Sequence, residues 1–260
     1  MKKLDLGRRE LVYVPESAWD EVDVEGLYLH ENHFTSLPDK FDVFKELRVL
    51  DLGHSRLEEL PDSLGELGKL EFLYLCDNQL RSLPSSLNKL SALIYLNFSD
   101  NPLEAFPDWI GDLKSLIELR AYNAGLTSLP ESIGGLLQLK ELHLQGNRLV
   151  SLSETLGRLV SLKRMNLEGN SLASLPDSVG DLKELKELNL RNNKLTAIPA
   201  SMAGMSKLEF LDLRANQLTS LPRDIGDLPN LEKLDLRWNP LASIDGWLDK
   251  LTGRGCVVYL

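Results

Sequence analysis

The sequence predicts an α/β solenoid, a stack of short similar units with a parallel β-sheet on its concave face and 3₁₀ or short helical segments on its convex face. Two observations carry this prediction. One pattern of apolar residues recurs every 23 residues, and a fixed period of this length is the signature of a repeat architecture. Within each unit the apolar spacing changes from two residues to three, as a strand followed by a 3₁₀ turn requires.

The repeat frame runs through almost the whole chain. Eleven units cover residues 1–253 without an insertion or deletion, and residues 254–260 remain as a capping strand. We therefore predict a single domain over residues 1–260. The units begin at Met1, Val24, Leu47, Leu70, Leu93, Leu116, Leu139, Leu162, Leu185, Leu208 and Leu231.

The positions of a unit, numbered 1 to 23, predict its elements in order. Apolar positions 4 and 6 alternate with polar neighbours, which indicates a strand with one buried face. Proline at position 15 suits the start of a short helical turn because it lacks an amide donor. Apolar positions 18, 21 and 1 of the next unit then follow the 3₁₀ period. Glycine at position 19 predicts a tight bend. A single unit cannot bury its apolar side chains, so neighbouring units must stack.

Position 9, where the strand turns out of the sheet, is usually asparagine. A buried amide there can satisfy backbone groups of its own and of adjacent units, so we predict a structural role. The unit that starts at Leu116 has Ala124 at this position and Asn123 one residue early, which predicts a slightly loosened or shifted turn. The ladder consists of Asn32, Asn78, Asn101, Asn147, Asn170, Asn193, Asn216 and Asn239.

At these residues the chain resembles the leucine-rich-repeat superfamily over its full length. The pattern Leu-x-x-Leu-x-Leu-x-x-Asn-x-Leu-x-x-Leu-Pro is similar in style to the Ras-group intracellular proteins and their bacterial relatives. The segment 246–260 looks like the terminal cap of bacterial members. The resemblance implies a curved right-handed horseshoe and a binding function, and it does not imply a particular partner.

Composition and charge narrow the function classes. The formal charge is −10, so we expect neither nucleic acid nor a membrane surface as partner. The chain has two cysteines, no apolar leader after Met1, and no apolar run long enough to span a membrane. We therefore expect a cytoplasmic monomer. Secretion by a route that needs no cleaved signal remains an alternative.

The concave face should carry the function, and its N-terminal half is rich in aromatic residues. Such side chains on adjacent strands resemble interface hot spots. The alternative is that they only stack on one another across strands. The candidates for partner binding here are Tyr28, His30, Val49, Phe72, Tyr74, Tyr95, Arg120 and Tyr122.

The C-terminal half of the same face carries Arg191, Arg214, Arg237 and Trp238. Arginine can clamp partner carboxylates through two hydrogen bonds. The alternative is a solvated ladder in which Asp212, Asp235 and Glu187 neutralise the arginines. The inner face and its rim carry equal numbers of basic and acidic residues, so the net negative charge lies on the convex side and loops.

Two chemical sites are alternatives to a binding surface. His30, His54, Cys76 and Asp77 could form a weak metal patch, and Cys76 could be a thiol nucleophile beside a histidine. The residues lack metal-ligand spacing, and a flat sheet offers no pocket. We therefore expect no catalytic residue, no metal and no cofactor.

The sequence favours a non-enzymatic scaffold that binds a protein or peptide on its concave sheet. Three alternatives remain. The first is a bacterial effector that is delivered to a host cell and binds a host signalling protein. The second is a metal- or thiol-dependent enzyme, and the third is a module that self-associates through its ends.

Overall fold

The computed structural model describes residues 2–242 and 246–260, and it divides the chain into two compact units, up to Leu126 and from Thr127 onward. We call them the N-terminal stack and the C-terminal stack. The N-terminal stack holds strands β1 (Lys3–Asp5), β2 (Gly26–Tyr28), β3 (Val49–Asp51), β4 (Phe72–Tyr74), β5 (Tyr95–Asn97) and β6 (Glu118–Arg120). Its 3₁₀ helices are η1 (Glu16–Asp20), η2 (Phe41–Val43), η3 (Asp62–Glu66), η4 (Ser85–Lys89) and η5 (Ile110–Asp112).

The C-terminal stack repeats this order and ends in an α-helix. Its strands are β7 (Glu141–His143), β8 (Arg164–Asn166), β9 (Glu187–Asn189), β10 (Phe210–Asp212), β11 (Lys233–Asp235) and β12 (Val257–Tyr259). Its helices are η6 (Glu131–Gly135), η7 (Glu154–Arg158), η8 (Asp177–Asp181), η9 (Ala200–Gly204), η10 (Arg223–Asp227) and α1 (Trp247–Thr252). Among the described residues, none of the helices combines the length and apolarity needed to cross a membrane.

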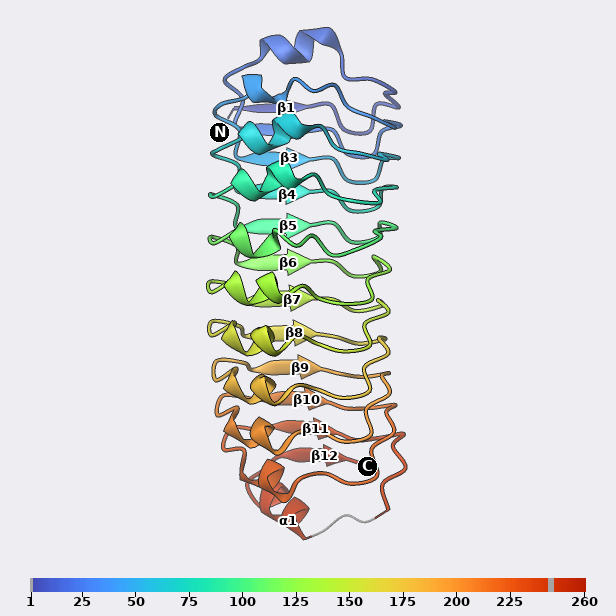
Figure 1. The fold of residues 1–260 in the computed structure, drawn as a ribbon, viewed down its shortest axis with the longest axis vertical. Helices are drawn as coiled ribbons and strands as arrows, with labels where there is room; N and C mark the ends of the chain where they lie inside the picture. Colours follow the sequence, from blue (N-terminus) through green and yellow to red (C-terminus); the bar gives the residue numbers. More distant parts are fainter. Residues whose placement is uncertain (1, 243–245) are drawn as a thin grey trace. The chain divides into compact units, whose positions relative to one another are not determined.

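Parallel strands in chain order form the sheet of each stack, and the short helices follow in a column of their own (Figure 1). Pairs such as Leu50↔Leu73 and Met165↔Leu188 lie one 23-residue unit apart. The predicted strands, 3₁₀ turns and parallel pairing are confirmed. We call the side that carries positions 3, 5 and 7, with position 8 at its edge, the strand face, and the side that carries the short helices the 3₁₀ face.

The core of each stack consists of leucines that recur at the same positions of successive units. Leu73 on β4 and Leu75 just after it are fully buried, because residues two apart on a strand point to the same side. At the N-terminal end, Trp19 packs its ring edge-on against Phe41 at 5.3 Å between ring centroids. This aromatic pair shields the first leucine layers from water.

The asparagines of position 9 link successive units through their side chains. Asn78 accepts a hydrogen bond from the Leu57 amide at 3.0 Å. Its Nδ2 donates to the carbonyl of Leu52 at 2.9 Å and to that of Leu75 at 3.1 Å. Each bond satisfies a backbone group that the turn leaves out of the sheet ladder. The same contacts recur at Asn101, Asn170, Asn193 and Asn216.

Position 8 adopts the left-handed backbone conformation in every unit. Non-glycine residues there include Arg8, Asn192 and Trp238, with φ between 51° and 62° across the column, and glycine fills it in two units. Asn123 shares this conformation at φ 51°, and β6 pairs with β5 in the usual register. Asn123 thus fills position 8 in register, so the turn is not displaced along the chain. Gly125 at position 10 of the same unit also has a positive φ of 73°, which among the described residues only Glu10 shares at that position. The expectation of a loosened or shifted turn is therefore confirmed only in part, because the turn keeps its register but differs in backbone conformation.

The left-handed column predicts that Ala215→Gly stabilises the protein. Ala215 has φ 52°, and a Cβ in this conformation costs about 1–2 kcal/mol. The greater freedom of glycine in the unfolded chain offsets part of the gain, so we expect the free energy of unfolding to rise by about 0.5–1 kcal/mol in urea titrations. The control is Ala173→Gly at an exposed position without positive φ, where the free energy of unfolding should fall. A loss of stability in Ala215→Gly would contradict the argument.

Glycine at position 19 serves close packing, which corrects the expectation of a tight bend. A Cβ built on Gly180 of η8 would lie 2.3 Å from the carbonyl oxygen of Ser201, and one on Gly65 of η3 would lie equally close to Ser86. Neither glycine has a positive φ. The glycines are needed because the backbone of each 3₁₀ turn rests directly on the turn of the next unit.

The end of the repeat departs from the 23-residue frame. Leu234 of β11 pairs with Val258 of β12, which lies 24 residues later instead of 23. The last unit therefore contains one extra residue, which corrects the prediction of an uninterrupted frame up to residue 253. The α-helix α1 takes the place of a 3₁₀ turn there. Because of this extra residue, Tyr259 stands beside Asp235 on the strand face.

Candidate binding surface

Three aromatic side chains of the N-terminal stack meet on the strand face. The ring centroid of Tyr95 on β5 lies 4.9 Å from that of Tyr74 and 6.3 Å from that of Phe72, both on β4. The guanidinium of Arg120 on β6 lies 5.8 Å from the Tyr95 ring centroid. We call these four residues the aromatic cluster. All four are half-buried, so they stack on one another and also present apolar area to the solvent.

The tyrosines of the aromatic cluster remain neutral at physiological pH. Burial raises the pKa of Tyr95 to about 12, against the opposing effect of the Arg120 charge. Burial also raises the pKa of Tyr74, and the nearby Asp51 carboxylate adds to the effect. The cluster is therefore an apolar surface whose phenol groups can donate hydrogen bonds.

The other candidates of the N-terminal stack lie around the aromatic cluster. The Tyr28 ring stands edge-on to His30 at 6.5 Å and beneath the Lys3 ammonium at 5.6 Å. Val49 pairs with Phe72 in the sheet register and is half-buried. Tyr122, which follows β6, is also half-buried, and burial raises its pKa.

The arginines of the C-terminal stack are paired with carboxylates of the same face. Arg214 Nε lies 2.9 Å from Asp212 Oδ1, and Arg237 Nη2 lies 2.7 Å from Asp235 Oδ2. Arg191 lies 3.6 Å from Glu168. Burial opposes ionisation of Asp235, which is 1% exposed, but hydrogen bonds from Arg237 hold its pKa below the usual value. The arrangement corresponds to the neutralising ladder.

Some residues of this surface escaped the sequence analysis. Tyr259, which was not among the candidates, stacks under the Arg237 guanidinium at 4.9 Å. The candidate Trp238 is exposed and lies 5.7 Å from the same group. The insertion before β12 hid Tyr259 from the repeat frame. A hollow of about 270 Å³ also opens on this face, with Phe210, Asn166 and Arg164 among its lining residues. Phe210 occupies position 3, so its exposure could have been found from the sequence.

Cys76 is poorly suited to act as a nucleophile. Burial, then the charges of Asp51, Asp77 and Asp100, raise the pKa of its thiol to about 11. Its sulfur lies 4.0 Å from His54 Nε2, while His54 Nδ1 lies 2.9 Å from Asp77. Only the thiolate attacks, so the surroundings of Cys76 disfavour thiol chemistry.

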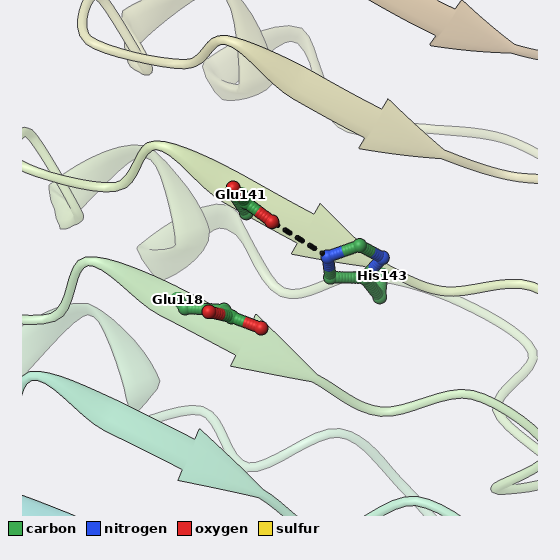
Figure 2. A group of neighbouring side chains, drawn as sticks. All are labelled: Glu118, Glu141 and His143. Atoms are coloured by element: carbon green, nitrogen blue, oxygen red, sulfur yellow. Dashed lines mark hydrogen bonds and ion pairs between the residues drawn. The ribbon is translucent and has the colours of Figure 1, made fainter.

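The remaining histidine of the strand face is engaged locally. His143 Nε2 lies 3.2 Å from Glu141 Oε2 on the same strand, β7 (Figure 2). The other oxygen of Glu141 accepts a hydrogen bond from Arg164 at 2.9 Å. In the N-terminal stack, Glu118 is paired with Arg120 at 2.6 Å. Glu141 and Glu118 are therefore both engaged in ion pairs or hydrogen bonds with neighbouring side chains.

Comparison with known proteins identifies the repeat. Residues 28–153 match the model of a leucine-rich repeat region, and residues 162–218 and 183–241 match a leucine-rich repeat model. A search of the curated proteins finds no match. A leucine-rich-repeat protein of Leptospira interrogans is 32% identical, with a TM-score of 0.84 over 100% of this chain and 72% of its own.

Two solved complexes contain chains with the same fold. The plant peptide hormone receptor RGFR1, solved in complex with RGF2, is 26% identical with a TM-score of 0.84, covering 100% of this chain. The Drosophila Toll–Spatzle complex gives 25% identity and a TM-score of 0.85 over 97% of this chain. This chain spans 47% and 35% of those two chains. The 23-residue frame, the parallel sheets and these matches show that the chain belongs to the leucine-rich-repeat family.

Proposed function

We propose that this protein is a non-enzymatic scaffold that binds a protein or peptide partner through the strand face of its N-terminal stack. The main support for this proposal is the aromatic cluster. The ring centroids of Tyr74 and Tyr95 lie 4.9 Å apart, yet both side chains remain partly exposed to solvent. Rigid aromatic side chains on a fixed sheet bring large apolar area with few rotatable bonds, which is the composition of interface hot spots.

The fold supports the same function. Leucine-rich repeats are typical of protein–protein interaction scaffolds and of receptors that bind ligands, and two of the similar structures are complexes with such ligands. A partner that touches several units at once gains affinity without a deep pocket. The ion pairs of the C-terminal stack leave its arginines less free to clamp a partner carboxylate, which supports the aromatic cluster as the main contact.

Removing the two stacked tyrosines tests the proposal. A partner is captured from native lysate with the wild-type protein and purified, and its dissociation constant is measured by titration. Tyr74→Ala combined with Tyr95→Ala should weaken binding by at least about 30-fold, because a hot-spot side chain contributes 2 kcal/mol or more. The rings pack mainly on each other, so the melting curve should stay cooperative with a modest decrease in midpoint.

The matched control is Tyr13→Ala, since Tyr13 is 73% exposed and lies outside the strands. This variant should bind as the wild type does. If the double variant loses stability but keeps its affinity, the aromatic residues only stabilise the sheet by cross-strand packing, and the proposed binding surface is wrong.

A further inference from the structure

Three aspartates near the aromatic cluster form no ion pair with a lysine or arginine among the described residues. Asp51, Asp77 and Asp100 lie on or just after β3, β4 and β5, in three successive units. At positions 3, 5, 7 and 8 of the units that start at Val24, Leu47, Leu70 and Leu93, no residue is lysine or arginine. The corresponding positions of the C-terminal stack carry basic and acidic residues in equal number. This part of the strand face is therefore acidic as well as aromatic.

The contacts of the three aspartates are with neutral or titratable groups. Asp51 accepts a hydrogen bond from the Gly53 amide at 3.0 Å, and its other oxygen lies 3.4 Å from His30 Nδ1. Asp77 lies 2.9 Å from His54. Asp100 Oδ1 accepts a hydrogen bond from the side-chain Nδ2 of Asn123 at 2.9 Å. Among the described contacts, none of the three carboxylates is joined to a lysine or arginine, so their charge remains available to a partner.

The charges of the three carboxylates act on one small patch next to the aromatic cluster, at Cys76. Cys76 follows β4, and backbone hydrogen bonds from the His54 amide to the Cys76 carbonyl and from the Asp77 amide to the Ser99 carbonyl join its turn to the two neighbouring units. The equivalent positions of those units are the small residues Gly53 and Ser99, and a Cβ on Gly53 would lie 3.2 Å from Cys76 Sγ and 3.3 Å from Asp51 Oδ1. All three aspartates contribute to the raised pKa of Cys76, and Asp51 contributes to that of Tyr74. Their field thus reaches the thiol and the rim of the aromatic cluster.

We propose that the partner presents a basic segment, with a lysine or arginine side chain that lies along Tyr74 and ends over Cys76 among Asp51, Asp77 and Asp100. This inference rests on the proposed function and names the chemistry of its partner. Long basic side chains place their methylenes on apolar surface while the charged head reaches polar groups, and charge-assisted hydrogen bonds to carboxylates are the stronger ones. Complementary charge also suppresses wrong partners.

Synthetic peptides of defined charge test the inference. Two pools of ten-residue peptides share the same apolar residues and differ only in two central positions, both arginine in one pool and both glutamate in the other. We expect the arginine pool to bind the full chain at least about tenfold more tightly in fluorescence anisotropy. Raising the salt from about 50 mM to about 500 mM should reduce this difference, because exposed charges are screened.

Substitutions on the strand face locate the effect. Asp51→Asn with Asp100→Asn keeps the local hydrogen-bond acceptors and should remove most of the preference for arginine. The control pair Glu187→Gln with Asp212→Asn, on the strand face of the C-terminal stack, should leave it unchanged. Tyr74→Ala with Tyr95→Ala should abolish binding of the arginine pool.

The outcomes separate the two proposals. If the tyrosine variant loses the captured partner but the peptide pools bind equally or not at all, the binding surface stands and the basic partner is wrong. If the preference survives in the aspartate variant, or if the arginine pool binds regardless of the tyrosines, the attraction comes from the overall charge of −10 and the inference is overturned.

Discussion

Leu144→Ala should lower the free energy of unfolding by about 2–5 kcal/mol, the usual cost of truncating a buried leucine. Leu144 follows β7 and is fully buried. Its carbonyl accepts hydrogen bonds from the side chains of Asn147 and Asn170, at 2.9 Å and 3.0 Å. These bonds hold the backbone in place, so the stack cannot collapse around the cavity, and the loss should fall in the upper part of this range. Urea titration followed by circular dichroism measures it.

The matched control for this truncation is Leu137→Ala. Leu137 belongs to the same stack but is 49% exposed, so its truncation should change the free energy of unfolding by less than about 1 kcal/mol. Equal losses in the two variants would show that position 6 of the unit is not part of the core.

Gly180→Ala adds a single methyl group and should nevertheless lower the free energy of unfolding by about 3 kcal/mol or more. The new Cβ would lie 2.3 Å from the carbonyl oxygen of Ser201, in the 3₁₀ turn of the next unit. Overpacking in a tight interior costs about 1–3 kcal/mol when side chains can move aside. Here the obstacle is main chain, so η8 and η9 must separate.

Gly68→Ala provides the control for the methyl group itself. A Cβ at Gly68 meets nothing within 4 Å, and its φ is not positive. Alanine at such a site reduces the freedom of the unfolded chain, so stability should stay the same or rise by up to about 1 kcal/mol. If both variants lose stability equally, glycine at position 19 is not required for turn-to-turn contact.

The elements of the fold could be predicted from the sequence because they depend on residue types with a period. The alternation around Leu73 and Leu75 identifies β4, and Asn78 marks the turn that follows. Local apolar spacing determines these features, and stacking repeats them in every unit. The aromatic residues of the strand face were also predictable, since positions 3 and 5 of a strand must point away from its buried position 4.

Three features depend on contacts between units and could not be derived from one unit's pattern. The left-handed position 8 holds residues as different as Arg8 and Trp238, although the frequent Asn, Asp and Gly in that column were a signal for it. Gly180 looks like a bend residue until the turn of the next unit is placed against it. The pairing of Arg237 with Asp235 and Tyr259 depends on an inserted residue that no period reveals.

Oxidative footprinting of the complex with the captured partner tests the central claim most directly. Hydroxyl radicals label exposed aromatic side chains, and mass spectrometry then reads the label at each residue. Our account predicts that the partner protects Phe72, Tyr74 and Tyr95 on the strand face, while Tyr13, which is 73% exposed, stays labelled as in the free protein. Unchanged labelling of the aromatic cluster, with protection confined to residues of the 3₁₀ face, would contradict it.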